Sequence, residues 1–194
     1  MPIHKLVGMV TPVRQFQFLL ASSGGWDYSA QKLRDAADAL FRFHFEGLRQ
    51  LLFDGDTDLH ERNYEGVGLA ILLLAGLAIE NLAKGLWILE NPEELSNDRL
   101  PKRLSKGHEM TVDLFQEADI RLTTKEKAFI TRLQVFVTWA GRYPVPKHVD
   151  NMKVQKTFRT DDFEQFKKLF DRLKALLRER RRAKTGASLR QSGR

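Results

Sequence analysis

A long apolar run over residues 64–89 constrains the fold of this chain more than any other part of the sequence. Its apolar residues lie on nearly every side of a helix, and such a helix is stable in water only when other elements surround it. We therefore predict that it forms the central helix of a bundle. Its most apolar part, residues 66–79, is too short to cross a bilayer, so no membrane partner is expected. Small residues along the run would let neighbouring backbones approach closely: Gly68, Ala75, Gly76 and Gly85.

Four more segments have the amphipathic pattern of helices. They cover residues 29–53, a short stretch over 108–118, residues 123–140, and a stretch that begins at Asp161. The third opens with Thr123 and Glu126 at the spacing of a capping box. No segment has a convincing strand pattern. The sequence therefore predicts an all-α fold, a single up-and-down bundle of about five helices.

The 194 residues suffice for one hydrophobic core, so we expect one domain with extensions. We predict an N-terminal arm over residues 1–27 with a break at 22–25, a helical domain over 28–182, and a flexible tail over 183–194. The chain has no cysteine, and residues 1–10 lack the apolar core of a secretory signal. A cytoplasmic location is therefore expected.

The net charge of +7 is concentrated at the C-terminal end. Nine Lys or Arg residues and one Glu lie within residues 172–194, so residues 1–171 are almost neutral. A basic end of this kind can hold the phosphate backbone of a nucleic acid, or it can simply keep the chain soluble. The composition leaves both interpretations open.

An acidic stretch between the first two helices has the spacing of a calcium-binding loop. Asp54, Asp56, Asp58 and Glu65 stand at positions 1, 3, 5 and 12. The sixth position of such a loop needs glycine for a sharp turn, and here it is Leu59, for which a positive φ is costly. We therefore expect no metal site.

Two polar features lie within apolar helical faces. His44 falls in the apolar stripe of the first helix, which predicts a buried core histidine. Glu80 and Lys84 stand four residues apart in the central run, where ion pairing across one helical turn is favourable. Most such pairs lie on the surface and add little stability, but because their surroundings here are apolar we expect this pair to line an interface or a pocket.

Three short motifs occur in order along the predicted helices. Glu80 and Lys84 lie on the central helix, Gly107-His108-Glu109-Met110 opens the next one, and Arg142-Tyr143-Pro144 follows the fourth. Their order resembles that of the HEPN family over residues 30–180. The resemblance implies a homodimer of four-to-five-helix bundles that binds nucleotides. In many members it implies a metal-independent endoribonuclease of toxin–antitoxin or antiviral defence.

The resemblance also implies site residues. The ligand contacts would be Glu80, Lys84, His108, Arg142 and Tyr143. In a nuclease, Arg142 and His148 would be the catalytic pair, since histidine can accept the proton of a ribose 2′-hydroxyl and arginine can stabilise the charged phosphorane.

Two prolines, Pro144 and Pro146, interrupt the interval between Arg142 and His148. The element is thus more similar to the non-nuclease branch of the family. We expect a non-catalytic dimer that binds a nucleotide or RNA without a cofactor. The alternatives are a metal-independent ribonuclease that uses Arg142 and His148, and an interaction module for a partner protein such as an antitoxin.

Overall fold

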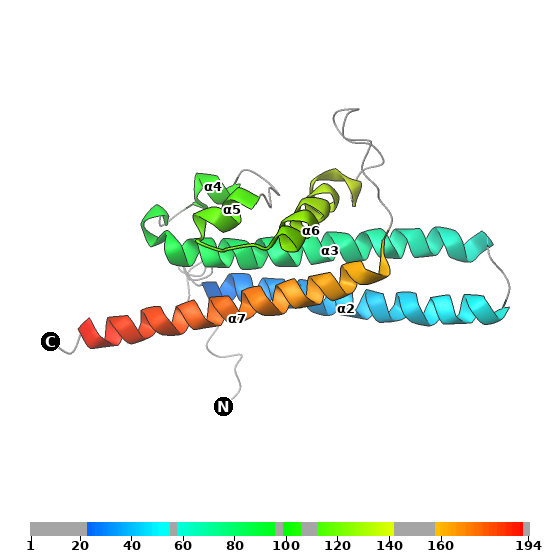
Figure 1. The fold of residues 1–194 in the computed structure, drawn as a ribbon, viewed down its shortest axis with the longest axis horizontal. Coiled ribbons are helices and arrows are strands. Elements are labelled where there is room, and N and C mark those ends of the chain that lie inside the picture. Colours follow the sequence, from blue (N-terminus) through cyan, green and yellow to red (C-terminus); the bar gives the residue numbers. More distant parts are fainter. Residues whose placement is uncertain (1–22, 55–57, 96–98, 106–111, 142–157, 192–194) are drawn as a thin grey trace, which may run out of the picture.

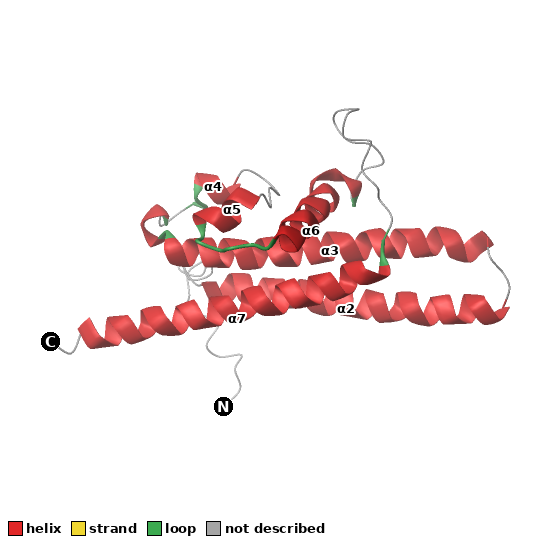
Figure 2. Ribbon diagram, in the orientation of Figure 1, coloured by secondary structure: helices red, strands yellow, loops and turns green. Residues whose placement is uncertain are grey.

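The computed structural model describes residues 23–54, 58–95, 99–105, 112–141 and 158–191. Every regular element in these ranges is a helix, which confirms the predicted all-α class (Figure 2). Within these ranges three helices are long and five elements are short. In chain order they are α2 (Ser23–Asp54), α3 (Asp58–Glu90), η3 (Pro92–Glu94), α4 (Lys102–Ser105), α5 (Val112–Glu117), α6 (Thr124–Val135) with its π-helical extension η4 (Phe136–Ala140), and α7 (Thr160–Gln191).

Helix α3 is the centre of the bundle, as its composition predicts. It packs against α2, α7, α5, α6 and η4. Figure 1 shows α2 and α3 side by side and antiparallel, with α7 along one side of the pair and α4, α5 and α6 on the other side of α3. The core between these layers is aromatic and aliphatic, and its largest fully buried side chains include Phe115, Phe136, Phe166, Phe170, Ile79 and Leu86.

Close backbone approach depends on the glycines of α3. A Cβ atom added at Gly68 would lie 2.6 Å from Cβ of Phe158, and one at Gly85 would lie 3.1 Å from Cβ of Trp26. At Gly76 an added Cβ would overlap the fully buried side chain of Val137. These glycines therefore set how closely α2, η4 and the start of α7 can approach α3, which confirms the prediction of tight packing there.

Helix α2 begins at Ser23, six residues before the predicted start, so the predicted break over residues 22–25 is wrong for Ser23, Gly24 and Gly25. Two glycines disfavour a helix locally. Here Ser23 accepts a hydrogen bond from Arg181 of α7, and Trp26 packs on Gly85 of α3. These contacts between distant parts of the chain outweigh the weak local propensity.

Two more predicted boundaries differ from the structure. Residues 91–107, where the sequence predicts no helix, contain η3 and α4. Helix α5 is described from Val112, and residues 106–111, which include the predicted start at His108, lie outside the described residues. Helix α7 continues to Gln191, so residues 183–191 are helical where the sequence predicts a flexible tail. The capping box of Thr123 and Glu126 is present at the start of α6, as predicted.

The acidic stretch over residues 54–65 does not have the conformation of a twelve-residue loop. Asp54 is the last residue of α2, and α3 has already begun at Asp58. Only residues 55–57 lie between the two helices. Positions 5 to 12 of the predicted loop are therefore helical backbone, unlike those of a calcium-binding loop.

The described part of the chain has one helix, over residues 66–90, that is long and apolar enough to cross a membrane. The apolar run is thus longer than the 66–79 stretch taken from the sequence, and length alone does not exclude a membrane span. More than half of its most apolar stretch is buried inside the bundle, which is typical of a core helix.

The glycine contacts predict a difference between two substitutions on the same helix. We expect Gly76→Ala to lower the free energy of unfolding by about 1–3 kcal/mol, because the added methyl group overlaps the buried Val137 side chain. Gly66 has no atom within 4 Å of an added Cβ, so Gly66→Ala should stabilise the protein by about 0.5–1 kcal/mol through helix propensity. Urea unfolding measures both values. Equal effects of the two substitutions would contradict the close contact at Gly76.

Candidate functional site

The Glu80–Lys84 pair lies in the contact between α3 and the first turns of α2. Nζ of Lys84 is 2.5 Å from Oε1 of Glu80, and only 12% of the Lys84 side chain and 4% of the Glu80 side chain are exposed. The ammonium group also lies 5.8 Å from the centre of the Trp26 ring, a cation–π distance. The structure brings these two predicted residues together as an enclosed ion pair within α3, and Lys84 contacts α2 through Trp26.

A second polar cluster lies between α2 and α7. Arg181 donates one hydrogen bond to Oγ of Ser23 at 2.6 Å and another to Asp27 at 3.4 Å. Nζ of Lys174 lies 3.6 Å from the same Asp27 carboxylate and donates to the side-chain oxygen of Gln31. The N-terminal turns of α2 are therefore fastened to α7 by two cations that share one carboxylate.

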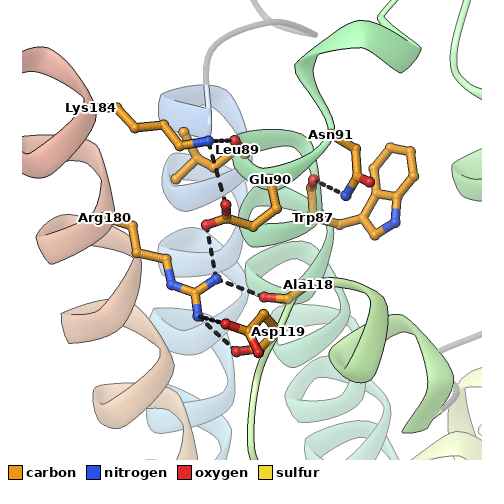
Figure 3. A network of polar contacts seen from close by, with 8 residues as sticks. All are labelled: Trp87, Leu89, Glu90, Asn91, Ala118, Asp119, Arg180 and Lys184. Carbon is orange, nitrogen blue, oxygen red and sulfur yellow. Dashed lines mark hydrogen bonds and ion pairs between the residues drawn. The ribbon is translucent and has the colours of Figure 1, made fainter. Parts of the chain in front are cut away.

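A third cluster fastens α7 to the C-terminal end of α3 and to the turn after α5 (Figure 3). Lys184 donates to the carbonyl oxygen of Leu89, one of the last carbonyls of α3, and lies 3.5 Å from Glu90. Arg180 binds Glu90 at 2.9 Å and donates to the carbonyl oxygens of Ala118 at 2.6 Å and Asp119 at 2.8 Å. Basic side chains are favourable at a helix C-terminus because they meet its unpaired carbonyl groups.

The start of α7 is held by a buried ion pair with α6. The Arg132 guanidinium donates to both carboxylate oxygens of Asp162, at 3.0 Å and 2.8 Å. Asp162 is fully buried and also accepts the backbone N–H of Arg159 at 2.9 Å. This two-point contact fixes where α7 begins, directly after the segment that contains the predicted arginine motif.

His44 is buried, as the sequence predicts, within an aromatic cluster. Its ring lies 5.4 Å from that of Phe158, and Phe158 also meets Phe41, which stacks on Phe163 at 3.6 Å. Burial lowers the pKa of His44, because the charged imidazolium loses its hydration. The neutral ring is therefore the form that suits this environment.

Four predicted site residues, His108, Arg142, Tyr143 and His148, lie outside the described residues. The residues that flank the segment 142–157 are described, and both lie against α3. A Cβ added at Gly141 would be 3.0 Å from Cβ of Leu73, and Phe158 packs on Gly68.

Gly141 ends the π-helical turn Phe136–Ala140, and its N–H bonds to the carbonyl of Phe136. Such turns often occur at functional sites.

A cavity of about 430 Å³ between α5 and α6 was not predicted from the sequence. Its charged lining residues, Asp119, Arg121 and Lys127, come from the turn between these helices and from the first turn of α6. The sequence contains no motif at these positions. The charged residues come to line one cavity because the chain turns at Asp119, which has a positive φ.

Comparisons with protein-family models, with curated proteins and with solved structures each found no match for this chain. The resemblance to the HEPN family therefore rests on the three sequence motifs and their order along the helices.

The enclosed Glu80–Lys84 pair predicts a stability effect. We expect Lys84→Met to lower the free energy of unfolding by about 3 kcal/mol, because it leaves the Glu80 carboxylate buried without this cation. Replacing both residues, as in Glu80→Leu combined with Lys84→Met, should restore most of the loss. Urea unfolding of the wild type, both single variants and the double variant gives the double-mutant cycle that measures the interaction energy of the pair. A double variant that is less stable than Lys84→Met would contradict a simple buried pair.

Burial of His44 predicts a pH dependence with a definite sign. Its pKa is lower in the folded protein than in the unfolded chain, so below about pH 6.5 the unfolded chain binds more protons. The stability that neutral His44 provides is therefore complete above that pH and is lost as the pH falls towards the folded-state pKa. We expect wild type to lose more unfolding free energy than His44→Gln between pH 7.5 and 5.5. Equal losses of unfolding free energy in the two proteins would show that His44 does not contribute to the pH dependence of stability.

Proposed function

We propose that this chain is a non-catalytic helical domain, similar to the HEPN family, that binds a nucleotide or RNA as a homodimer. The observation that carries the proposal is the attachment of the flanks of segment 142–157 to one stretch of α3. Gly141 contacts Leu73, and Phe158 contacts Gly68. Binding residues are commonly carried by loops on a rigid scaffold, and here the scaffold is the most buried helix of the bundle.

Within this proposal, Arg142 and Tyr143 are the ligand contacts. An arginine guanidinium matches the oxygens of a phosphate, and a tyrosine ring can stack on a base. Glu80 and Lys84 act as positioning residues, since their ion pair within α3 leaves little of either side chain accessible and Lys84 lies against Trp26 of α2. His108 remains a predicted contact. The two prolines between Arg142 and His148 favour binding over catalysis.

The homodimer is supported by aromatic side chains on α2. Tyr28 is 63% exposed, Phe43 65% and Phe45 40%. Phe43 and Phe45 stand about 200° apart round the helix, so the three rings do not form one patch. We propose that a second copy of this chain covers at least one of them in a symmetric contact. Light scattering of the purified protein at tens of micromolar measures whether the dimer forms.

Removal of the Arg142 charge should weaken RNA binding. We expect Arg142→Ala to raise the dissociation constant for a fluorescent single-stranded RNA by about tenfold, since it removes a charge-assisted contact to phosphate. Lys168→Ala removes the same charge from the exposed face of α7 and should have a much smaller effect. Fluorescence anisotropy at two salt concentrations measures both values.

Three results would contradict this proposal. RNA cleavage in EDTA that disappears in His148→Ala would identify a ribonuclease instead. Equal weakening by Arg142→Ala and Lys168→Ala would show only non-specific attraction. Absence of any binding to RNA or to a nucleotide would leave the domain as an interaction module for a protein partner.

A further inference from the structure

The cavity between α5 and α6 combines an apolar surface with a charged rim. Ile120 is almost fully buried and Leu122 is half-buried, and both line it together with Val112. The charged groups at the rim, Arg121, Lys127 and Asp119, are exposed. Its volume of about 430 Å³ lies within the range of small-molecule sites. This combination suits a small ligand that has one apolar part and one charged part.

The two cations at the rim are available to a ligand. In the described part of the chain, the side chains of Arg121 and Lys127 form no ion pair or hydrogen bond. The nearby carboxylate of Glu126 does not compete for them. One of its oxygens accepts hydrogen bonds from the backbone N–H and hydroxyl of Thr123, and the other binds Arg172 at 2.6 Å.

Asp119 is the only acidic residue that lines the cavity within the described ranges, and it has a partner of its own. Its carboxylate lies 4.0 Å from the Arg180 guanidinium on the α7 side of the turn. Among the residues that the structure describes, the rim therefore carries two cations without a direct ionic partner. Two such cations match a dianion better than a monoanion, because each can neutralise one unit of charge.

The turn over residues 118–120, which forms one side of the cavity, is held by contacts within the bundle. Asp119 has a φ of 51°, in the left-handed region that only a few residue types tolerate, aspartate among them. Arg180 holds this turn through the carbonyl oxygens of Ala118 and Asp119, as Figure 3 shows. The backbone N–H of Ile120 bonds to the carbonyl of Phe115 at 2.8 Å. A preformed site loses less conformational entropy on binding.

We propose that this cavity binds a small organic phosphate, with the phosphate dianion between Arg121 and Lys127 and an apolar group against Ile120 and Leu122. Arginine supplies a planar fork for two phosphate oxygens, and lysine supplies a compact second charge. Arg180 is a positioning residue, since it holds the turn and does not line the cavity. This site shares no residue with segment 142–157, so it stands apart from the proposed RNA contact.

Isothermal titration of the full chain with phenyl phosphate tests the site at pH 7.5, where the phosphate is largely a dianion. We expect Arg121→Gln and Lys127→Gln each to weaken binding by about tenfold. Lys125→Gln removes an exposed charge from the same turn of α6 without touching the cavity and should change the affinity by less than about twofold. All three positions are exposed, and circular dichroism checks that the variants fold.

A substitution that should tighten binding provides a second test. Asp119→Asn removes the acidic group from the rim, and asparagine tolerates the same left-handed backbone. We expect it to tighten phenyl phosphate binding, whereas Asp113→Asn, an exposed change on α5 that does not line the cavity, should not. In amide NMR spectra, phenyl phosphate should shift the signals of residues 119–122, and inorganic phosphate should bind more weakly because it lacks the apolar group.

Four results would overturn the proposal. The first is no binding of phenyl phosphate up to about 10 mM, a concentration at which only affinities too weak for specific recognition would remain undetected. The second is an equal loss of affinity for phenyl phosphate in Lys125→Gln and Lys127→Gln. The third and fourth are binding of inorganic phosphate, or of benzoate, as tightly as phenyl phosphate. Arg142→Ala should bind phenyl phosphate like the wild type, so failure here and failure of the RNA proposal are separate outcomes.

Discussion

The burial of α3 is the constraint on which the rest of this structure depends. A helix with apolar residues on nearly every side is stable in water only when most of its surface is covered, and α2, α7, α5 and the α6–η4 unit all pack against it. The glycines of α3 then decide how close these neighbours come. At Gly76 the neighbour is Val137 of η4, and at Gly68 it is Phe158, just before α7. The most apolar part of the sequence thus fixes the distances in the bundle as well as its centre.

Basic side chains of α7 fasten the ends of this apolar assembly. Arg181 reaches the first turn of α2, and Lys184 and Arg180 reach the end of α3, while Arg180 also holds the turn after α5. These cations meet carboxylates and backbone carbonyls, which are the groups that a helix end leaves without partners. The positive charge at the C-terminal end is therefore partly used inside the fold. It is weaker evidence for nucleic-acid binding than the net charge alone suggests.

The two candidate sites differ in what supports them. Arg142 and Tyr143 are known only as sequence motifs, while the residues that flank the segment 142–157 contact the central helix of the bundle. The cavity at Arg121 and Lys127 has no sequence motif, but its shape, its charges and its fixed turn are all defined by the structure. For Lys84 the sequence motif and the structure suggest different roles. Its motif suggests a ligand contact, and its enclosure with Glu80 and Trp26 indicates a role in packing.

The sequence by itself determined the helical class, the central helix, the burial of His44 and the cap of α6, because each depends on residues within a few turns of one another. It did not determine where α2 begins, that α7 continues to Gln191, or the cavity between α5 and α6. The start of α2 depends on a hydrogen bond from Arg181 to Ser23, and the wall of the cavity depends on Arg180 at the carbonyl of Ala118. Those partners lie far apart in the chain. Only the packed bundle brings them together, since the free energy of such contacts exists only after the long helices have met.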